Sequence, residues 1–270
     1  MQFLVVQGLS ERRACQLLQV QRSTVQYQAR PDRNVELQTT MQQLAQQHRR
    51  YGYRRIYRLL RRRGRVVNKK RVQRLWQRAK LQVGRPRRKR RRPTQPPPQQ
   101  ATYPKHVWTY DFVKDRCLDG TPLRILTVMD EFTREGLTIA VRRSFPARQV
   151  VVVLAGLFRE HGSPAYLRSD NGPEFVALAV RGWLHQQHVQ TLYIDPGCPW
   201  QNGYEERFNG TVRDECLNCH AFVSVAEAQV LCAAYLREYN EERPHSSLEY
   251  QTPLEFKRDW YVRQSHQRGL

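Results

Sequence analysis

Three acidic side chains in this sequence have the type and spacing of a site for divalent cations. Asp111 lies inside a strand-like run, Asp170 follows a buried-strand pattern, and Glu206 lies near the start of a helical pattern, with 35 residues between Asp170 and Glu206. Carboxylate oxygens are the ligands that Mg²⁺ prefers in proteins. Two bound ions can activate an attacking oxygen and stabilise a leaving oxygen during phosphodiester cleavage. The three acids therefore predict a catalytic site that uses two Mg²⁺ or Mn²⁺ ions.

The elements around these acids predict a mixed α/β fold. Strand patterns cover 107–113, 123–129, 137–141, 165–169 and 190–194, and helical patterns cover 147–161, 174–188 and a stretch from 201. Turn residues separate the first three strands, which favours an antiparallel meander. The order βββαβαβα predicts a mixed sheet with helices on its faces. In such a sheet Asp111 lies on the central strand, Asp170 ends the neighbouring strand, and Glu206 reaches across from a helix.

The region before the sheet reads as small helical domains. Residues 9–29 predict two short helices, capped by Ser10 and Ser23, with helix-turn-helix proportions. Three more helices are expected at 35–48, at 54–63, and after a cap at Asn68. These patterns divide the chain into a helix-turn-helix segment at 1–33, a three-helix DNA-binding domain at 34–83, a basic, proline-rich linker at 84–100, a catalytic core at 101–215 and a C-terminal helical extension at 216–270.

The positive charge of the chain is confined to its first 100 residues. The net charge is +22, yet residues 1–100 hold 27 basic and three acidic residues, a balance of +24, and the remainder carries −2. Residues 51–100 contain no acid, and seven of the eight residues at 85–92 are basic. A surface that is merely solvated usually mixes both signs, so this asymmetry favours double-stranded DNA as the partner over a membrane surface.

Individual residues follow from these patterns. Asn171 is expected to orient Asp170 or a phosphate. Arg243 and His245 are expected either to contact DNA or to pack the C-terminal segment against the core. The residues expected to contact DNA are Arg54, Arg55, Lys69, Lys70, Arg71, Arg74, Arg87, Arg88, Lys89 and Arg90, and those expected to support the site are Asn171, Asn202 and Asn209.

The six cysteines are scattered, and neither a signal peptide nor a membrane span is visible, which favours free thiols in a reducing cytoplasm. Cys216, Cys219 and His220 spell a haem-attachment motif. The two cysteines together with His185 and His188 imitate a zinc module. Both matches are interpreted as chance. No export signal accompanies the first, and the second would have to fold around the helix that carries Glu206.

The sequence resembles the catalytic core shared by retroviral integrases and bacterial insertion-sequence transposases. More closely, it resembles the second-reading-frame product of insertion sequences that encode their transposase in two overlapping frames. The resemblance covers essentially the whole chain and rests on RYGYRR at 50–55, WTYDF at 108–112, DEFTRE at 130–135, DNGPEF at 170–175, FNG at 208–210, RDECLN at 213–218 and YNEERPHSSL at 239–248.

This resemblance implies a ribonuclease H-like core whose catalytic and metal-binding triad is Asp111, Asp170 and Glu206. It implies metal-dependent nicking of DNA at element ends and strand transfer, by a homo-oligomer on DNA that is joined by the upstream-frame product. Glu206 occupies the acidic position of the family's helix pattern, while Glu205 stands where an apolar residue is usual and Arg207 where Ser is usual. The alternative is a catalytically impaired, DNA-binding regulator derived from such a transposase.

Overall fold

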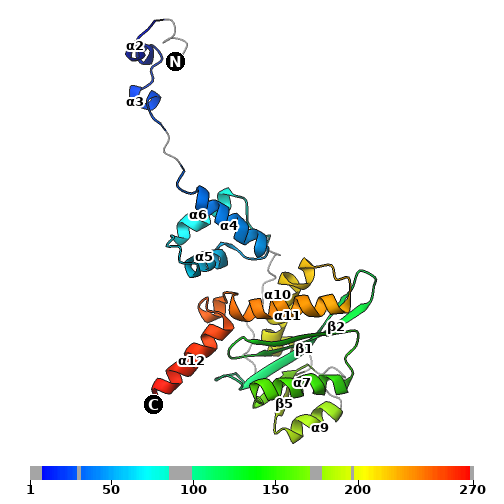
Figure 1. The fold of residues 1–270 in the computed structure, drawn as a ribbon. Helices are drawn as coiled ribbons and strands as arrows, with labels where there is room; N and C mark the ends of the chain where they lie inside the picture. The colour runs from blue at the N-terminus through cyan, green and yellow to red at the C-terminus, as the bar shows by residue number, and fades with distance from the viewer. Residues whose placement is uncertain (1–7, 29–31, 85–98, 171–177, 196–197, 268–270) are drawn as a thin grey trace. The chain divides into compact units, whose positions relative to one another are not determined.

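A computed structural model describes residues 8–28, 32–84, 99–170, 178–195 and 198–267 of the chain (Figure 1). The chain divides into two units, Met1–Gln42 and Gln43–Leu270. No helix in the described residues is long and apolar enough to cross a membrane.

The first unit contains two short helices, α2 (Glu11–Leu17) and α3 (Arg22–Val25). The hydroxyl of Ser10 accepts a hydrogen bond from the Arg13 backbone N–H at 3.4 Å and caps α2, as expected. The cap expected at Ser23 is wrong, because the helix already begins at Arg22 and Ser23 lies inside it. An extended backbone at Gln21, with φ −65° and ψ 135°, starts α3 earlier than the residue types indicated.

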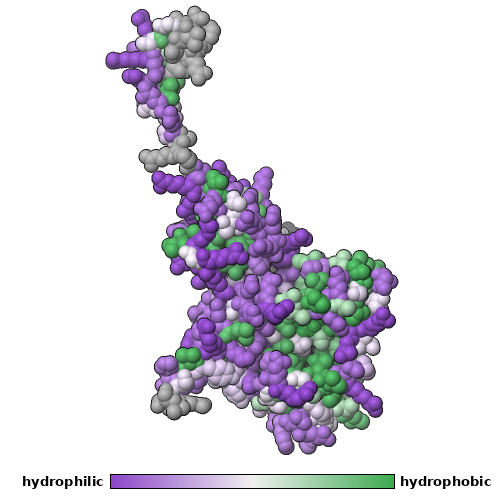
Figure 2. All heavy atoms as spheres, viewed as in Figure 1, coloured by the Kyte–Doolittle hydropathy of each residue, from purple (hydrophilic) through white to green (hydrophobic). Residues whose placement is uncertain are grey.

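Helix α4 (Val35–Gln47) begins in the first unit and ends in the second, which also holds α5 (Tyr53–Arg62) and α6 (Lys69–Arg78). These bounds agree with the expected helices to within one residue. Gly64 ends the α5 region with φ +77°, a left-handed conformation that glycine adopts without strain. Asn68 caps α6 by accepting the Lys70 N–H at 2.8 Å, as expected. Most of the visible surface over α4–α6 is hydrophilic (Figure 2).

A five-stranded mixed sheet lies at the centre of the second unit. Its strands are β1 (Val107–Arg116), β2 (Pro122–Asp130), β3 (Gly136–Arg142), β4 (Tyr166–Ser169) and β5 (Gln190–Tyr193), in the order β3-β2-β1-β4-β5. The first three strands pair antiparallel, while β4 is parallel to β1 and β5 is parallel to β4. The expected meander and mixed sheet are both confirmed, and β1 is the central strand.

Helices cover both faces of this sheet (Figure 1). On one face, α7 (Ala147–His161) and α9 (Leu178–Gln186) bury apolar side chains such as Leu154 and Leu184 against Trp108 and Leu126. The helix expected from residue 174 is described only from Leu178 onward. The other face is covered by α10 (Gly203–Glu215), which a 3-10 turn at Pro199–Asn202 precedes, and by α11 (Val225–Glu241). Short 3-10 turns at Leu217–Cys219 and Ser246–Leu248 follow α10 and α11, and α12 (Pro253–Gln267) comes last.

Gly136 allows α10 and α11 to approach β3 closely. A Cβ atom there would lie 2.7 Å from Leu236 Cδ1 and 2.9 Å from Phe208 Cζ, closer than carbon atoms can pack. The Gly136 backbone N–H donates a hydrogen bond to Asn240 Oδ1 at 2.9 Å. The Asn240 side-chain N–H in turn donates to the Gly136 carbonyl oxygen at 2.7 Å. Phe208 belongs to α10, so this contact helps to fix the helix that carries the predicted Glu206 over the sheet.

Candidate active site

Asp111 and Asp170 lie on neighbouring parallel strands. The last register pair between β1 and β4 is Thr109 with Arg168. Asp111 comes two residues later inside β1, and Asp170 comes two residues later, directly after β4 ends at Ser169. Because side chains alternate between the faces of a strand, residues two apart point to the same side. The two carboxylates are close enough that the charge of Asp170 raises the pKa of Asp111. The structure therefore brings these two predicted residues together.

The carboxylate of Asp111 is half-buried and held at both oxygens. Its Oδ1 accepts the Phe112 backbone N–H at 2.6 Å, and its Oδ2 accepts a hydrogen bond from the Asn209 side-chain amide at 3.0 Å. Burial raises the pKa of Asp111 to about 6, and the negative charge of Asp170 adds to the increase, while these hydrogen bonds oppose it. Crowded negative charge of this kind is what a divalent cation offsets.

Two asparagines join α10 and the turn before it to the central strands. The hydroxyl of Thr109 donates to Asn202 Oδ1 at 2.7 Å, and the hydroxyl of Thr127 lies 2.8 Å from Asn209 Oδ1. Both threonines are completely buried, and Thr127 is the register partner of Asp111 on β2. Sequence analysis missed these threonines, although a hydroxyl residue within the apolar run of β2 was a signal that something polar faces it.

The structure places the two adjacent glutamates of α10 in different environments. Glu205 is completely buried, whereas Glu206 is exposed. Consecutive helical residues point about 100° apart, so only one of them can face the interior. Burial raises the pKa of Glu205 well above its ordinary value, and the charges of Asp111 and Glu131 add to the increase. Within the described part of the chain neither carboxyl oxygen of Glu205 has a hydrogen-bond partner.

The third predicted ligand is not gathered with the first two. Among the described residues, no three His, Cys, Asp or Glu side chains are close enough to hold a metal ion together, so Asp111, Asp170 and the exposed Glu206 do not form a complete three-carboxylate group here. The donor chemistry nevertheless fits Mg²⁺, because Asp111 and Asp170 are hard carboxylate ligands that repel each other without a cation.

Acids near the site have structural contacts. Asp130 accepts backbone N–H groups from Lys105, Phe132 and Thr133 at 2.6 to 2.9 Å and so shapes the turn after β2. Glu131 forms a buried ion pair with Arg168 at 2.7 Å. These contacts give both acids a structural role beside the site.

The predicted DNA-binding residues separate into three groups. Arg54, Lys69, Lys70 and Arg74 are exposed on α5 and α6, and Arg71 is half-buried. Arg55 instead forms an ion pair with Glu215 at 2.8 Å. The predicted contacts Arg87, Arg88, Lys89 and Arg90, and the predicted supporting residue Asn171, lie outside the described residues.

Arg243 and His245 are both 5% exposed. The structure therefore favours the packing role for these two residues over DNA contact. Burial and the neighbouring Arg243 lower the pKa of His245 to about 2, so the imidazole is neutral and lacks the charge that phosphate contact would use.

Models of two kinds of known family match this chain. Residues 101–199 and 187–253 each match a model described as an integrase core domain. Residues 31–90 match a model described as an HTH-like domain.

Several insertion-element proteins are similar along most of their length. The Insertion element IS407 uncharacterized 31.7 kDa protein of Burkholderia multivorans is 42% identical, with 92% of this chain and 91% of that protein covered. The Insertion element IS476 uncharacterized 39.2 kDa protein of Xanthomonas euvesicatoria is 41% identical, with 96% and 75% covered. The Putative transposase InsK for insertion sequence element IS150 of Escherichia coli is 27% identical, with 90% and 92% covered.

Among solved structures, a chain of the simian T-cell lymphotropic virus intasome in complex with PP2A regulatory subunit B56 gamma has the same core fold. It aligns with a TM-score of 0.53 at 16% identity, covering 59% of this chain and 56% of that one.

Proposed function

The chain belongs to the insertion-sequence transposases that carry an integrase core domain, and from that premise we propose that it cleaves and joins DNA strands at a site formed by Asp111, Asp170 and Glu206. The observation that carries this proposal is the closeness of Asp111, inside β1, to Asp170, which directly follows the parallel strand β4, next to a helix that binds Asp111 through Asn209.

Asp111, Asp170 and Glu206 would hold two Mg²⁺ or Mn²⁺ ions. Such ions supply activation of the attacking oxygen and stabilisation of the leaving oxygen in phosphodiester chemistry. Glu206 is exposed on the first turns of α10, the helix whose Asn209 already reaches Asp111. Glu206 comes three residues before Asn209, so the two side chains share one side of α10, and we propose that the Glu206 side chain turns from there toward the aspartates.

The protein's own residues position the reaction. Asn209 and the Phe112 N–H fix the orientation of the Asp111 carboxylate, and Thr127 fixes the Asn209 amide. A water molecule or a DNA 3′-hydroxyl attacks the phosphodiester in line, and the leaving 3′-oxygen departs from phosphorus without a covalent intermediate on the protein. Water would nick the element end, and the released 3′-hydroxyl would then attack the target strand.

Double-stranded DNA is the proposed partner of the basic residues on α5 and α6. Exposed cations on these helices neutralise phosphates without reading sequence, and the HTH-like match spans the same residues. We further infer a homo-oligomer on DNA, an upstream-frame product as the protein partner, and action at the nucleoid of the bacterial cytoplasm.

Mg²⁺-dependent nicking of element-end DNA tests the proposal. Wild type should nick, and Asp170→Asn and Glu206→Gln should each lower the rate at least about a thousandfold, because each removes a ligand of ions on which the chemistry depends. Glu205→Gln is the matched control on the same helix and should retain nicking.

Two results would count against the proposal. If wild type bound DNA but never cut it, even with its upstream-frame partner present, the regulator alternative would be favoured. If Glu205→Gln abolished nicking while Glu206→Gln spared it, the third ligand would be Glu205.

A further inference from the structure

The last residue of α10, Glu215, gathers side chains from three other segments. Its side chain is 8% exposed, and its two oxygens accept four hydrogen bonds. The Arg243 guanidinium donates to both oxygens, at 2.6 Å to Oε2 and 2.7 Å to Oε1. Arg55 of α5 donates to Oε1 at 2.8 Å, and the Tyr235 hydroxyl of α11 lies 3.3 Å from Oε2. One carboxylate therefore ties α5, α11 and the C-terminal segment to the end of α10.

The geometry of this cluster is more ordered than that of an ordinary surface ion pair. A planar guanidinium that reaches both oxygens of a carboxylate adds directional as well as electrostatic constraint. Arg243 also lies over the Tyr239 ring at 5.3 Å, and Arg55 over the Tyr51 ring at 5.1 Å. These rings limit where either guanidinium can move, so the position of Glu215 is restricted from both sides.

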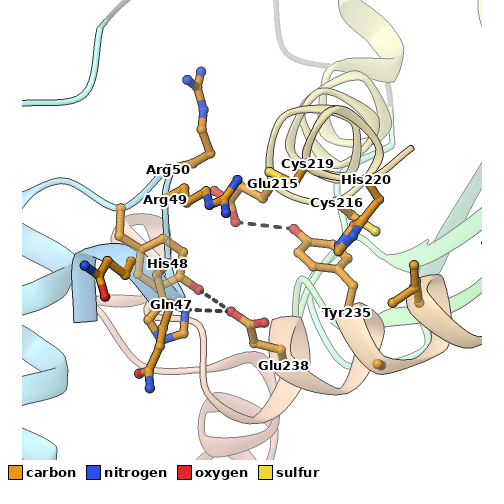
Figure 3. A pocket seen from close by; sticks show the side chains of 14 residues that line it. Gln47, His48, Arg49, Arg50, Glu215, Cys216, Cys219, His220, Tyr235 and Glu238 are labelled. Carbon is orange, nitrogen blue, oxygen red and sulfur yellow. Dashed lines mark hydrogen bonds and ion pairs between the residues drawn. The ribbon is translucent and has the colours of Figure 1, made fainter. Parts of the chain in front are cut away.

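A cavity lies beside the cluster, on the boundary between residues 46–51 and helices α10 and α11. It measures about 500 Å³, and its lining includes Tyr51, Glu215, Tyr235 and Glu238 (Figure 3). His48 and Tyr51 reach Glu238 of α11 at 2.9 Å and 3.3 Å. The cavity occupies part of the boundary between residues 46–51 and α11, and the hydrogen bonds of His48 and Tyr51 to Glu238 connect the two sides beside it.

We propose that Glu215 is a positioning residue through which α5 sets the place of α10, and with it Asn209 and Glu206, relative to Asp111. The inference rests on the proposed function of that site. Glu215 comes six residues after Asn209 on one continuous helix, about 9 Å along the axis at 1.5 Å per residue. A helix of this length moves as a rigid rod, so a shift at Glu215 reaches Asn209.

Two neighbouring arginines of α5, Arg54 and Arg55, relate the contact between α5 and Glu215 to the proposed binding of DNA. Arg54 is exposed and belongs to the predicted DNA contacts, while the next residue, Arg55, points to Glu215. Adjacent helical side chains diverge by about 100°, so one short segment of α5 faces both partners. DNA held on the outer face of α5 thereby restrains the helix that orders the catalytic carboxylates.

A second ion pair of α5 supplies a matched control. Arg62 pairs with Glu255 of α12 and has a side chain 29% exposed, against 27% for Arg55. Both arginines join α5 to the remainder of the second unit, yet Arg62 reaches α12 rather than α10. Comparing Arg55→Met with Arg62→Met thus separates the position of α10 from general stability.

The experiment uses the full chain with element-end DNA and three readouts. These are kcat for Mg²⁺-dependent nicking, Kd for DNA without Mg²⁺, and amide hydrogen exchange of residues 203–215. For Arg55→Met we expect kcat to fall about tenfold, exchange to accelerate about tenfold, and Kd to stay within about twofold, since misplacing a catalytic group costs rate rather than affinity. Arg55→Lys, which keeps the charge, should recover part of kcat. Arg62→Met should leave kcat and the exchange of 203–215 within about twofold.

Three outcomes would overturn the proposal. A raised Kd for Arg55→Met, with unchanged kcat and exchange, would make Arg55 a DNA contact. Equal losses of kcat in Arg55→Met and Arg62→Met would make the effect one of stability. Unchanged exchange of 203–215 in Arg55→Met would show that α10 does not depend on the link. If wild type fails to nick, the proposed function fails, while the exchange comparison still decides the positioning role.

Discussion

The side-chain amide of Asn209 donates a hydrogen bond to Asp111 Oδ2 at 3.0 Å, which joins the helix of one predicted ligand to the strand of another. The opposite end of the same amide lies 2.8 Å from the Thr127 hydroxyl, so its orientation is fixed on both sides. Asp111 is consequently held before any substrate arrives, and α10 is tied to the central strand by polar contacts in addition to the packing of Phe208.

Replacing Asn209 should therefore impair catalysis more than folding. We expect Asn209→Ala to lower kcat for nicking by about tenfold to a hundredfold, because the Asp111 carboxylate loses the donor that orients it. The free energy of unfolding should fall by only about 1 kcal/mol, the usual loss for one hydrogen bond. Nicking assays and urea denaturation measure the two effects. Asn218→Ala, at an exposed position just after α10, is the control and should change neither.

Substitutions of the adjacent glutamates Glu205 and Glu206 should differ in their effect on the free energy of unfolding as well as on nicking. Glu205 buries a carboxyl group whose oxygens have no hydrogen-bond partner among the described residues. Replacing such a group with an apolar side chain removes its desolvation cost, so Glu205→Leu should raise the free energy of unfolding by about 1 to 2 kcal/mol. Glu206→Gln should leave stability unchanged because Glu206 is exposed. Urea denaturation tests both, and a destabilised Glu205→Leu would mean that this carboxyl makes a favourable contact.

Magnesium should stabilise the protein through the aspartate pair. A ligand at about a hundredfold excess over its Kd stabilises the folded state by roughly 2.7 kcal/mol, so saturating Mg²⁺ should raise Tm, and a chelator should reverse the increase. Asp111→Asn and Asp170→Asn should abolish this Mg²⁺ response. Asp119→Asn, on the turn between β1 and β2, should keep it. A full response in both site variants would place the bound ion elsewhere.

The Glu215 cluster predicts a specific dependence of stability on pH. Burial acts to raise the pKa of Glu215, but the charges of Arg243 and Arg55 outweigh it and hold the pKa below its ordinary value. A folded-state pKa below the unfolded value of about 4.3 means that the stabilisation is complete above that pH and is lost as pH falls toward the folded value. His245, with a pKa of about 2, stays neutral over this range.

Glu215→Gln should accordingly cost about 3 kcal/mol near neutral pH, because it leaves a buried guanidinium without its counter-charge. The difference from wild type should be constant between about pH 6 and pH 8 and should shrink below about pH 4. Urea denaturation across this range measures it. A difference that persists undiminished at the lowest pH would show that charge on Glu215 is not its source.

Exposed cations on α6 should set the salt dependence of DNA binding. Each lost phosphate contact reduces the slope of log K against log salt by about 0.9. Replacing Lys69, Lys70 and Arg74 together with alanine should therefore lower the slope by between about 2 and 3, with nearly equal effects on different DNA sequences. Fluorescence anisotropy over a salt series measures this. Arg159→Ala, an exposed arginine on α7, should leave the slope unchanged.

Local patterns in the sequence determined most of the architecture. Strand-like runs bounded by turn residues predicted the strands, and helical periodicity predicted α4 to α7 close to their observed bounds. The positions of Asp111 and Asp170 also followed, because the order of strands and helices alone places a central strand beside the strand that ends at Asp170. The cap at Ser23 failed because a residue type indicates a helix start only weakly when the helix is one turn long.

The tertiary structure decided which side chains meet. In α10 Glu205 lies three residues before Phe208 and seven before Val212, so helical spacing puts it on their apolar side, and the packing of those two side chains in the core buries it. Arg55 belongs to an unbroken basic run and yet binds a carboxylate 160 residues away. Burial and pairing are properties of segments distant in the chain, so the sequence alone determined the elements and two of the carboxylates, while the complete burial of Glu205 and the partners of Asn209 and Glu215 required the folded arrangement.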